Sequence, residues 1–454
     1  MPLKPEQAII YNADFPKYAG KVEGTQLADW EKRIDMSKMR KDRHAKFVQD
    51  MKDRGITVAL IVERRNVRYT TGYNAASYEM GIGWAIVPVE GTPILWAHVK
   101  NAGDIQTRRE FGWIPPEDIR AADFPLETSP MPEMQAERRE ELAKEIKGEL
   151  EYRKLDKEVL VLDGSYPRME AALEKVGIKT RVDPDMGIDA MSIKTPEEIE
   201  CFRVLAAICD IVHWDTARYA RPGLTELDIT GYFRHRAMQL GCECEAGGFT
   251  MSGEHTFPNI RVAGHRIIRP GDIVYWDPWG LTWNGYRSCY YRTFIAGFKA
   301  PQRVQDAIKV ANEKQYNAIT AAKPGNTTTD MLKASGSGFI HIHGLGLECY
   351  VLKPVNSHSG LSKDYPCELK EGMVFAMTVN ASNPGELSVI GPVGDGQGVD
   401  IEDMVLVTKT GAEVLTRFPS DVVLTVPLED DQGYVYRSPE DYLREAKIRL
   451  NLPE

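Results

Sequence analysis

The sequence predicts an α+β protein with two domains, an α/β domain over residues 1–190 and a second domain over residues 191–454. Three observations lead to this prediction. The chain has 454 residues, of which 43% are hydrophobic and 27% are charged, as is typical of a protein with a large core and more than one domain. Apolar strands alternate with amphipathic helices up to about residue 190. Beyond that point, one arrangement of helix and cap occurs twice, about 100 residues apart.

The N-terminal domain opens on a helix. Residues 37–53 have helical periodicity, and Gly55 and an apolar strand at 56–62 follow them. Apolar and β-branched residues predict further strands at 84–87, 93–99 and 159–163. Helices are predicted between these strands at 134–149 and 166–176. This alternation of helices and strands is typical of an α/β domain.

The second domain begins with a helix-capping sequence. Thr195 can cap the first free amides, Pro196 suits the first helical turn, and Glu198 occupies the capping-box position, so we expect a helix to about residue 219. Residues 221–228 and 323–330 then repeat one design, with a Pro-Gly stop, a threonine cap and an acid three positions later. The repetition predicts an internally duplicated domain. Its strands are expected at 272–276 and 290–296 in the first half, and at 339–343, 373–379 and 400–407 in the second.

Charge and composition narrow the range of partners. The formal net charge is −10 and the chain has no block rich in lysine and arginine, which argues against a nucleic-acid surface or a polybasic membrane anchor. No run of 18 apolar residues and no basic, apolar leader is present, so we expect a cytoplasmic protein without a membrane span. The seven cysteines are an odd number without paired spacing, and we expect them to be reduced. The expected partner is a small molecule.

Four motifs follow one another in the second domain. They are Arg266–Asp272 followed by Asp277, Gly285–Thr293, His343–Gly346, and Glu402–Thr408. In this order they resemble the creatinase and methionine-aminopeptidase superfamily, whose fold is called pita-bread, and the resemblance covers nearly the whole chain. Residues 66–72 and 364–366 look most like the branch that contains the dimethylsulfoniopropionate lyases. The resemblance implies a pita-bread C-terminal domain, a creatinase-like N-terminal domain and a homodimer.

The chain departs from the family at the metal ligands. Metal-dependent members hold two divalent ions with two aspartates, a histidine and two glutamates, and Asp277, His343 and Glu402 match three of these positions. Cys289 stands at the second aspartate and Thr378 at the first glutamate. A thiol and a hydroxyl do not complete a cage for two ions, because such cations need several charged oxygens. We therefore predict that the protein uses no metal, with a single Zn or Fe ion at Asp277, Cys289, His343 and Glu402 as the minor alternative.

The remaining titratable residues suit acid/base chemistry. His341 and His343 are two apart on a predicted strand and therefore share a face. Asp277 and Glu402 are expected to face each other and to raise each other's pKa. The candidate catalytic residues are His343, Asp277, Glu402 and His341. For His343 and His341 the alternative is a structural hydrogen bond, and for His341 it is the favoured one. For Asp277 and Glu402 the alternative is a buried remnant that pairs with Arg292 or a nearby amide.

The hairpin around Asp277 is rich in aromatic residues, which predicts a slot for a flat aromatic ligand. The alternative is that these rings fill the space that metals and waters occupy in relatives. The candidate substrate-binding residues are Trp279, Trp283, Tyr286, Cys289, Tyr350, Thr378, Arg261 and His255. For His255, an exposed polar pair with Glu254 on the same loop is the favoured alternative.

Together these observations predict a metal-independent lyase. Its substrate would be a small aromatic compound, such as a lignin-derived phenylcoumaran, cleaved at a C–C bond by general acid/base catalysis with release of formaldehyde. Two alternatives stay open: a creatinase-like, metal-free C–N hydrolase whose cationic substrate sits among indoles, and a catalytically silent pita-bread protein that binds a partner.

Overall fold

The computed structural model describes most of the chain between residues 34 and 426. The described ranges are 34–73, 83–98, 113–122, 124, 131–243, 248–257, 261–297, 300–336, 340–347, 366–380, 397–420 and 424–426. They belong to two compact units, one over Ile34–Glu197 and one that begins at Glu198. The mixture of helices and sheets confirms the predicted α+β class.

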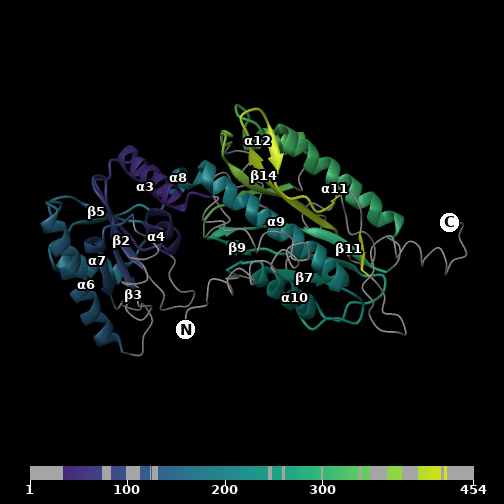
Figure 1. Ribbon diagram of the computed structural model, residues 1–454, viewed down its shortest axis with the longest axis horizontal. Coiled ribbons are helices and arrows are strands. Elements are labelled where there is room, and N and C mark those ends of the chain that lie inside the picture. The colour runs from purple at the N-terminus through teal and green to yellow at the C-terminus, as the bar shows by residue number, and fades with distance from the viewer. Residues whose placement is uncertain are drawn as a thin grey trace, which may run out of the picture. The chain divides into compact units, whose positions relative to one another are not determined.

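The N-terminal unit is built around a mixed six-stranded sheet with the order β4-β3-β2-β1-β5-β6 (Figure 1). Its strands are β1 (Val58–Ile61), β2 (Trp84–Pro88), β3 (Ile94–His98), β4 (Ile119–Ala122), β5 (Leu160–Leu162) and β6 (Thr180–Val182). The central strand β1 runs parallel to β5 and antiparallel to β2. All four residues of β1 are buried, which agrees with its continuous apolar sequence.

The helices of this unit cover the sheet. They are α3 (Met36–Asp53), α4 (Arg64–Thr71), η3 (Pro116–Asp118), α6 (Pro132–Tyr152), α7 (Pro167–Lys175) and α8 (Ile188–Ser192). Leu142, Ile146 and Leu150 recur along α6 at intervals of four residues and pack against the apolar side chains of the sheet and α7. In the described part of the chain, no helix combines the length and the apolar character that a membrane span requires.

A buried carboxylate joins β5 to the start of α4. Asp163 is 2% exposed and accepts hydrogen bonds from the amides of Val62 and Glu63 and from the side chain of Asn66. Burial raises the pKa of Asp163 to about 6, although these hydrogen bonds oppose the shift. The carboxylate therefore positions a short helix whose own sequence is only weakly helical.

The C-terminal unit consists of two similar halves. The first half contains α9 (Pro196–Tyr219), α10 (Glu226–Gln239), β7 (Phe249–Ser252), η4 (Gly253–Thr256), β8 (Ile273–Asp277), β9 (Thr282–Trp283), β10 (Tyr286–Arg287) and β11 (Arg292–Ala296). The second half contains α11 (Gln302–Ala321), α12 (Thr328–Ala334), β12 (Ile340–Gly344), β13 (Val374–Asn380), β14 (Asp400–Val407) and β15 (Ala412–Val414), and β16 (Leu424–Val426) returns to the first sheet. The two sheets have the orders β16-β11-β8-β7 and β12-β13-β14-β15. Helix α10 packs against β7, and α11 packs against β13 and β14 (Figure 1).

The internal duplication is visible in the helix caps. Thr225 and Asp228 form a complete capping box at α10, and Thr327 and Asp330 form the same box at α12. Each threonine also makes an isolated antiparallel bridge to a later segment of its own half. The repeat predicted from the sequence is therefore present in the structure.

The two halves meet along β11 and β14, which belong to different sheets. The amide of Glu402 donates to the carbonyl of Tyr291 at 3.1 Å. The Thr293 hydroxyl donates to the Asp400 carbonyl at 2.6 Å and accepts from the Asp400 amide at 2.8 Å. We call this line of contacts the seam between the halves.

Candidate active site

The first half presents Asp277 and Cys289 on a well-braced hairpin. Trp276 stacks on Phe294 with ring centroids 3.7 Å apart, and its indole N–H donates to Nδ1 of His213 at 2.9 Å. Because Nδ1 accepts this bond, Nε2 of His213 carries the proton and donates to the carbonyl of Tyr290 at 3.1 Å. Burial lowers the pKa of His213, so the ring is neutral and bonds to both strands of the hairpin.

The second half presents a histidine on β12 and a glutamate on β14, the two strands that flank β13 in the sheet. In the register of the sheet, His341 pairs with Thr378 and Thr378 pairs with Glu402. Nε2 of His343 lies 3.8 Å from Oε1 of Glu402. The Thr378 hydroxyl donates a short hydrogen bond to the same Oε1. Strand alternation brings His341 and His343 to one face as predicted, with ring centroids 5.1 Å apart.

The two sets of side chains converge in the interior. Ligand atoms of Cys289, His343 and Glu402 all lie within 4.8 Å of one another. The Cys289 thiol also lies 4.0 Å from Oδ2 of Asp277. Asp277 and Glu402 are fully buried, and His343 and Cys289 are at most 5% exposed. The structure therefore places four of the predicted site residues in one enclosed cluster.

Burial and the mutual repulsion of their negative charges make the acidic groups of this cluster costly to ionise. Burial, and then the charge of Glu402, raise the pKa of Asp277 well above its ordinary range. Burial raises the pKa of Glu402 to about 7, and burial together with both carboxylates raises the pKa of the Cys289 thiol. Oε2 of Glu402 is buried and has no hydrogen-bond partner among the residues that the structure describes. The Cys289 thiol also interacts with the Glu402 carboxylate, and a bound cation would satisfy the buried oxygen.

The buried arginine nearest in sequence does not neutralise this cluster directly. Arg292, 3% exposed, donates to the carbonyls of Tyr291, Glu402, Phe418 and Pro419. Its guanidinium also pairs with the Asp403 carboxylate at 2.6 Å. The carboxylate that pairs with Arg292 is therefore Asp403, and not Glu402 or Asp277 as predicted.

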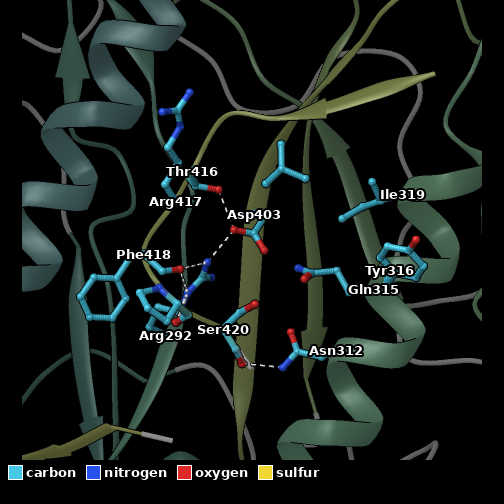
Figure 2. A pocket seen from close by; sticks show the side chains of 12 residues that line it. Arg292, Asn312, Gln315, Tyr316, Ile319, Asp403, Thr416, Arg417, Phe418 and Ser420 are labelled. Atoms are coloured by element: carbon cyan, nitrogen blue, oxygen red, sulfur yellow. Dashed lines mark hydrogen bonds and ion pairs between the residues drawn. The ribbon is translucent and has the colours of Figure 1, made fainter. Parts of the chain in front are cut away.

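This ion pair forms one wall of a separate cavity of about 300 Å³. Figure 2 shows Asp403 between helix α11, which carries Gln315, and the segment that contains Thr416, with Arg292 beside Phe418. Asp403 follows Glu402 on β14, so the two carboxylates point to opposite faces of the strand. The cavity lies behind the cluster and is not part of it.

Other predicted site residues are spread more widely. Trp279 is partly exposed and its ring centroid is 6.3 Å from that of Phe249, which pairs with Asp277 across the sheet. Tyr286 is fully buried, packs on Phe202, and donates its hydroxyl to Glu198 at 2.9 Å. Its place in the core does not support a role in substrate binding.

The remaining predicted residues lie on short strands and loops. Trp283 is partly exposed on β9, and the side chain of Arg261 is exposed. His255 is 28% exposed, and its Nδ1 lies 3.0 Å from the fully buried Glu226 carboxylate, so it is not simply part of an exposed polar pair. Tyr350 lies outside the described residues.

One residue of the site was not predicted in its observed role. The Tyr291 hydroxyl hydrogen-bonds to the Asp277 carboxylate, which also accepts the amides of Tyr290, at 3.0 Å, and of Trp279. Tyr291 is two residues after Cys289, and alternation along the strand could have placed it on the same face.

Fold and site together define a pita-bread protein whose ligand cluster is built from both halves of a duplicated domain. The family model "Metallopeptidase family M24" matches residues 200–409, and "Creatinase/Prolidase N-terminal domain" matches residues 43–151. The Xaa-Pro dipeptidase of Pyrococcus furiosus is 30% identical over 276 residues, which are 57% of this chain and 74% of that protein. The chain belongs to metallopeptidase family M24, with a creatinase-type N-terminal domain.

Solved structures agree with this fold. The Xaa-Pro dipeptidase from Bacillus anthracis matches with a TM-score of 0.66 and 19% identity over 85% of this chain and 99% of that one. The prolidase from Pyrococcus furiosus matches with a TM-score of 0.62 and 23% identity, over 82% of this chain and 99% of that one.

These comparisons correct two predictions. The metal-independent lyase for aromatic compounds is contradicted, because the relatives are dipeptidases and prolidases, which are hydrolases. The hydrolase alternative agrees better with them. The prediction of no metal cofactor is also contradicted, because the family is one of metallopeptidases. The prediction of a lyase gave too much weight to the two replaced metal ligands, Cys289 and Thr378, and to the aromatic hairpin.

The described residues fit part of the family's metal chemistry. Thr378 donates a hydrogen bond where the resemblance expects a carboxylate ligand, so the set does not fit two ions. Asp277, Cys289, His343 and Glu402 do fit one divalent ion, because they offer carboxylate, thiolate and imidazole donors within a small volume.

Proposed function

We propose that this chain is a metal-dependent hydrolase that cleaves the C–N bond of a small peptide with proline after the scissile bond. The observation that carries the proposal is the buried convergence of Cys289, His343 and Glu402 beside Asp277. Membership of family M24 and the similarity to Xaa-Pro dipeptidases support the same reaction and the same substrate class.

The residues that would hold the cation are Asp277, Cys289, His343 and Glu402. When bound there, a divalent cation supplies Lewis-acid polarisation of the scissile carbonyl. Nδ1 of His343 lies 3.4 Å from the carbonyl of Gly344, an interaction that favours a proton on Nδ1 and leaves Nε2 as the ligand atom.

The chain's own residues would orient the substrate and move a proton. His341 is only partly buried on the same face as His343, so it can donate a proton to the departing amine. In the balanced reaction, water gives a hydroxyl to the carbonyl carbon and a proton to the nitrogen as the C–N bond breaks. Trp279, beside Asp277, offers an aromatic face to the proline ring.

The test is a panel of matched dipeptides, Xaa-Pro and Xaa-Ala, incubated with protein that has been stripped of metal and reloaded with Zn²⁺, Co²⁺, Mn²⁺ or Fe²⁺. We expect release of free proline with at least one of these ions, and a loss of at least about 100-fold in kcat for His341→Gln. An absence of proline release with every ion would refute the proposal.

Three further expectations stay predictions from the sequence. They are a homodimer, a cytoplasmic location, and a position next to the dimethylsulfoniopropionate-lyase branch, which rests on residues 66–72 and 364–366. Size-exclusion chromatography with light scattering tests the first.

A further inference from the structure

The two oxygens of the Glu402 carboxylate have different environments. Oε1 accepts the short hydrogen bond from Thr378 and lies 3.8 Å from Nε2 of His343. Oε2 is buried and lacks a hydrogen-bond partner within the described part of the chain. One oxygen is thus engaged by the protein, and the other is left for a ligand.

Thr378 removes a second ion site in two ways. It contributes a neutral hydroxyl where the family pattern has a carboxylate, and that hydroxyl acts as a donor towards Glu402. Thr378 and Glu402 are direct partners in the register of β13 and β14, so the hydroxyl lies beside the Glu402 carboxylate.

Cys289 changes which ion the remaining site prefers. Its sulfur lies 4.0 Å from Oδ2 of Asp277 and belongs to the cluster whose ligand atoms lie within 4.8 Å of one another. Ligand atoms around one tetrahedral Zn²⁺ lie roughly 3.3–3.8 Å apart, given bond lengths of about 2.0–2.3 Å. The observed spacing therefore needs only a small contraction around one ion. A thiolate also favours Zn²⁺ over Mg²⁺ or Mn²⁺.

We propose that this chain holds one thiophilic divalent cation in place of the family's two ions, with Cys289, His343 and Glu402 as ligands and Asp277 as the fourth. Thr378 leaves a second ion without its carboxylate ligand, and its hydroxyl engages one oxygen of Glu402. The inference deepens the proposed function, since it concerns the same site and names the state of its metal.

The experiment titrates Co²⁺ into metal-free, full-length protein and reads both the stoichiometry and the thiolate-to-cobalt charge-transfer absorption. We expect about one ion per chain together with that absorption. Cys289→Ser should abolish the absorption and weaken Co²⁺ binding by more than about 100-fold, because removal of a ligand costs more than removal of its hydrogen-bond partner. Cys209→Ser, at a buried cysteine of α9, is the matched control and should keep both signals.

A gain of the second ion provides an independent test. The double variant Cys289→Asp/Thr378→Glu restores the family's ligand types and should bind about two ions per chain without the thiolate absorption. Circular dichroism of each variant verifies that it is folded, and Thr378→Glu alone replaces the double variant if that protein does not fold. Thr378→Val should still bind about one ion, because it adds no carboxylate.

Three results would overturn the inference: two ions in the wild-type protein, no ion at all, or charge-transfer absorption that persists in Cys289→Ser. Dipeptide hydrolysis on the same samples separates this inference from the proposed function. One thiolate-bound ion without hydrolysis refutes the function alone, and hydrolysis with two bound ions refutes the single-ion inference alone.

Discussion

Replacing Arg292 by methionine tests how the interior behind the site is held together. The guanidinium is 3% exposed and bonds to four main-chain carbonyls and to Asp403, which is 4% exposed. Methionine keeps much of the volume but leaves the Asp403 carboxylate buried, with the Thr416 hydroxyl as a remaining donor. Breaking a buried ion pair in this way typically costs about 3–5 kcal/mol. We expect Arg292→Met to lower the free energy of unfolding by that amount.

The assay is urea unfolding of Arg292→Met, Asp403→Leu and the double variant, followed by tryptophan fluorescence. The double variant should cost at least about 2 kcal/mol less than the sum of the single variants, because it removes both charges together. The pair Arg203–Glu413 is the matched control, with a 2.8 Å contact but exposed side chains of 41% and 37%. Its removal should cost about 1 kcal/mol or less. Additive single variants, or an Arg292→Met cost equal to that of Arg203→Met, would refute the reasoning.

Three further predictions concern pH, helix capping and metal. The folded-state pKa of Asp163 is about 6, above the ordinary 3.8, so its contribution to stability is fully present below pH 3.8 and is lost as the pH rises through 6. Relative to Asp163→Asn, the free energy of unfolding of the wild-type protein should therefore fall by about 3 kcal/mol between pH 3.5 and pH 7, as measured by urea unfolding. A difference between the two proteins that does not change with pH would contradict this. Thr225→Ala removes one partner of the capping box at α10 and should cost about 1 kcal/mol by the same assay, whereas Thr225→Ser should cost much less. Zn²⁺ at about 100 times its Kd should stabilise metal-free protein by about 2.7 kcal/mol in thermal unfolding, and an equal effect in Glu402→Gln would argue against binding at this site.

Regular elements with a strong local pattern could be predicted from the sequence. Strand β14 was expected at 400–407 and is Asp400–Val407, and the two capping sequences mark α10 and α12. Helix α4 was missed, because its residues Arg64–Thr71 are mostly polar and the Asp163 carboxylate about 100 residues away positions its start. The short edge strands β4 and β6 were also missed, because edge strands carry a weak apolar signal.

The site residues that belong to ordered motifs could be predicted from the sequence. Those whose hydrogen-bond partners lie in distant segments of the chain were predicted less well. Asp277, His343 and Glu402 converge as the motif order implied. Tyr286 was assigned to substrate binding because it lies in the aromatic hairpin, but its hydroxyl bonds to Glu198, 88 residues earlier. His255 was read as an exposed loop residue, and its buried partner Glu226 lies 29 residues earlier. Hydrogen bonds between residues this far apart in the chain cannot be predicted from the periodicity of the sequence.

Because the two halves meet at the seam between β11 and β14, both of them contribute side chains to the ligand cluster. Asp277 and Cys289 come from the first half of the duplicated domain, while His343 and Glu402 come from the second. Each half also carries one of the two departures from the family pattern, Cys289 in the first and Thr378 in the second. Exchanging either half for that of a relative would therefore combine parts of two different ligand sets in one site. Although the two halves repeat one design, they contribute to a single site and have to keep matching ligands.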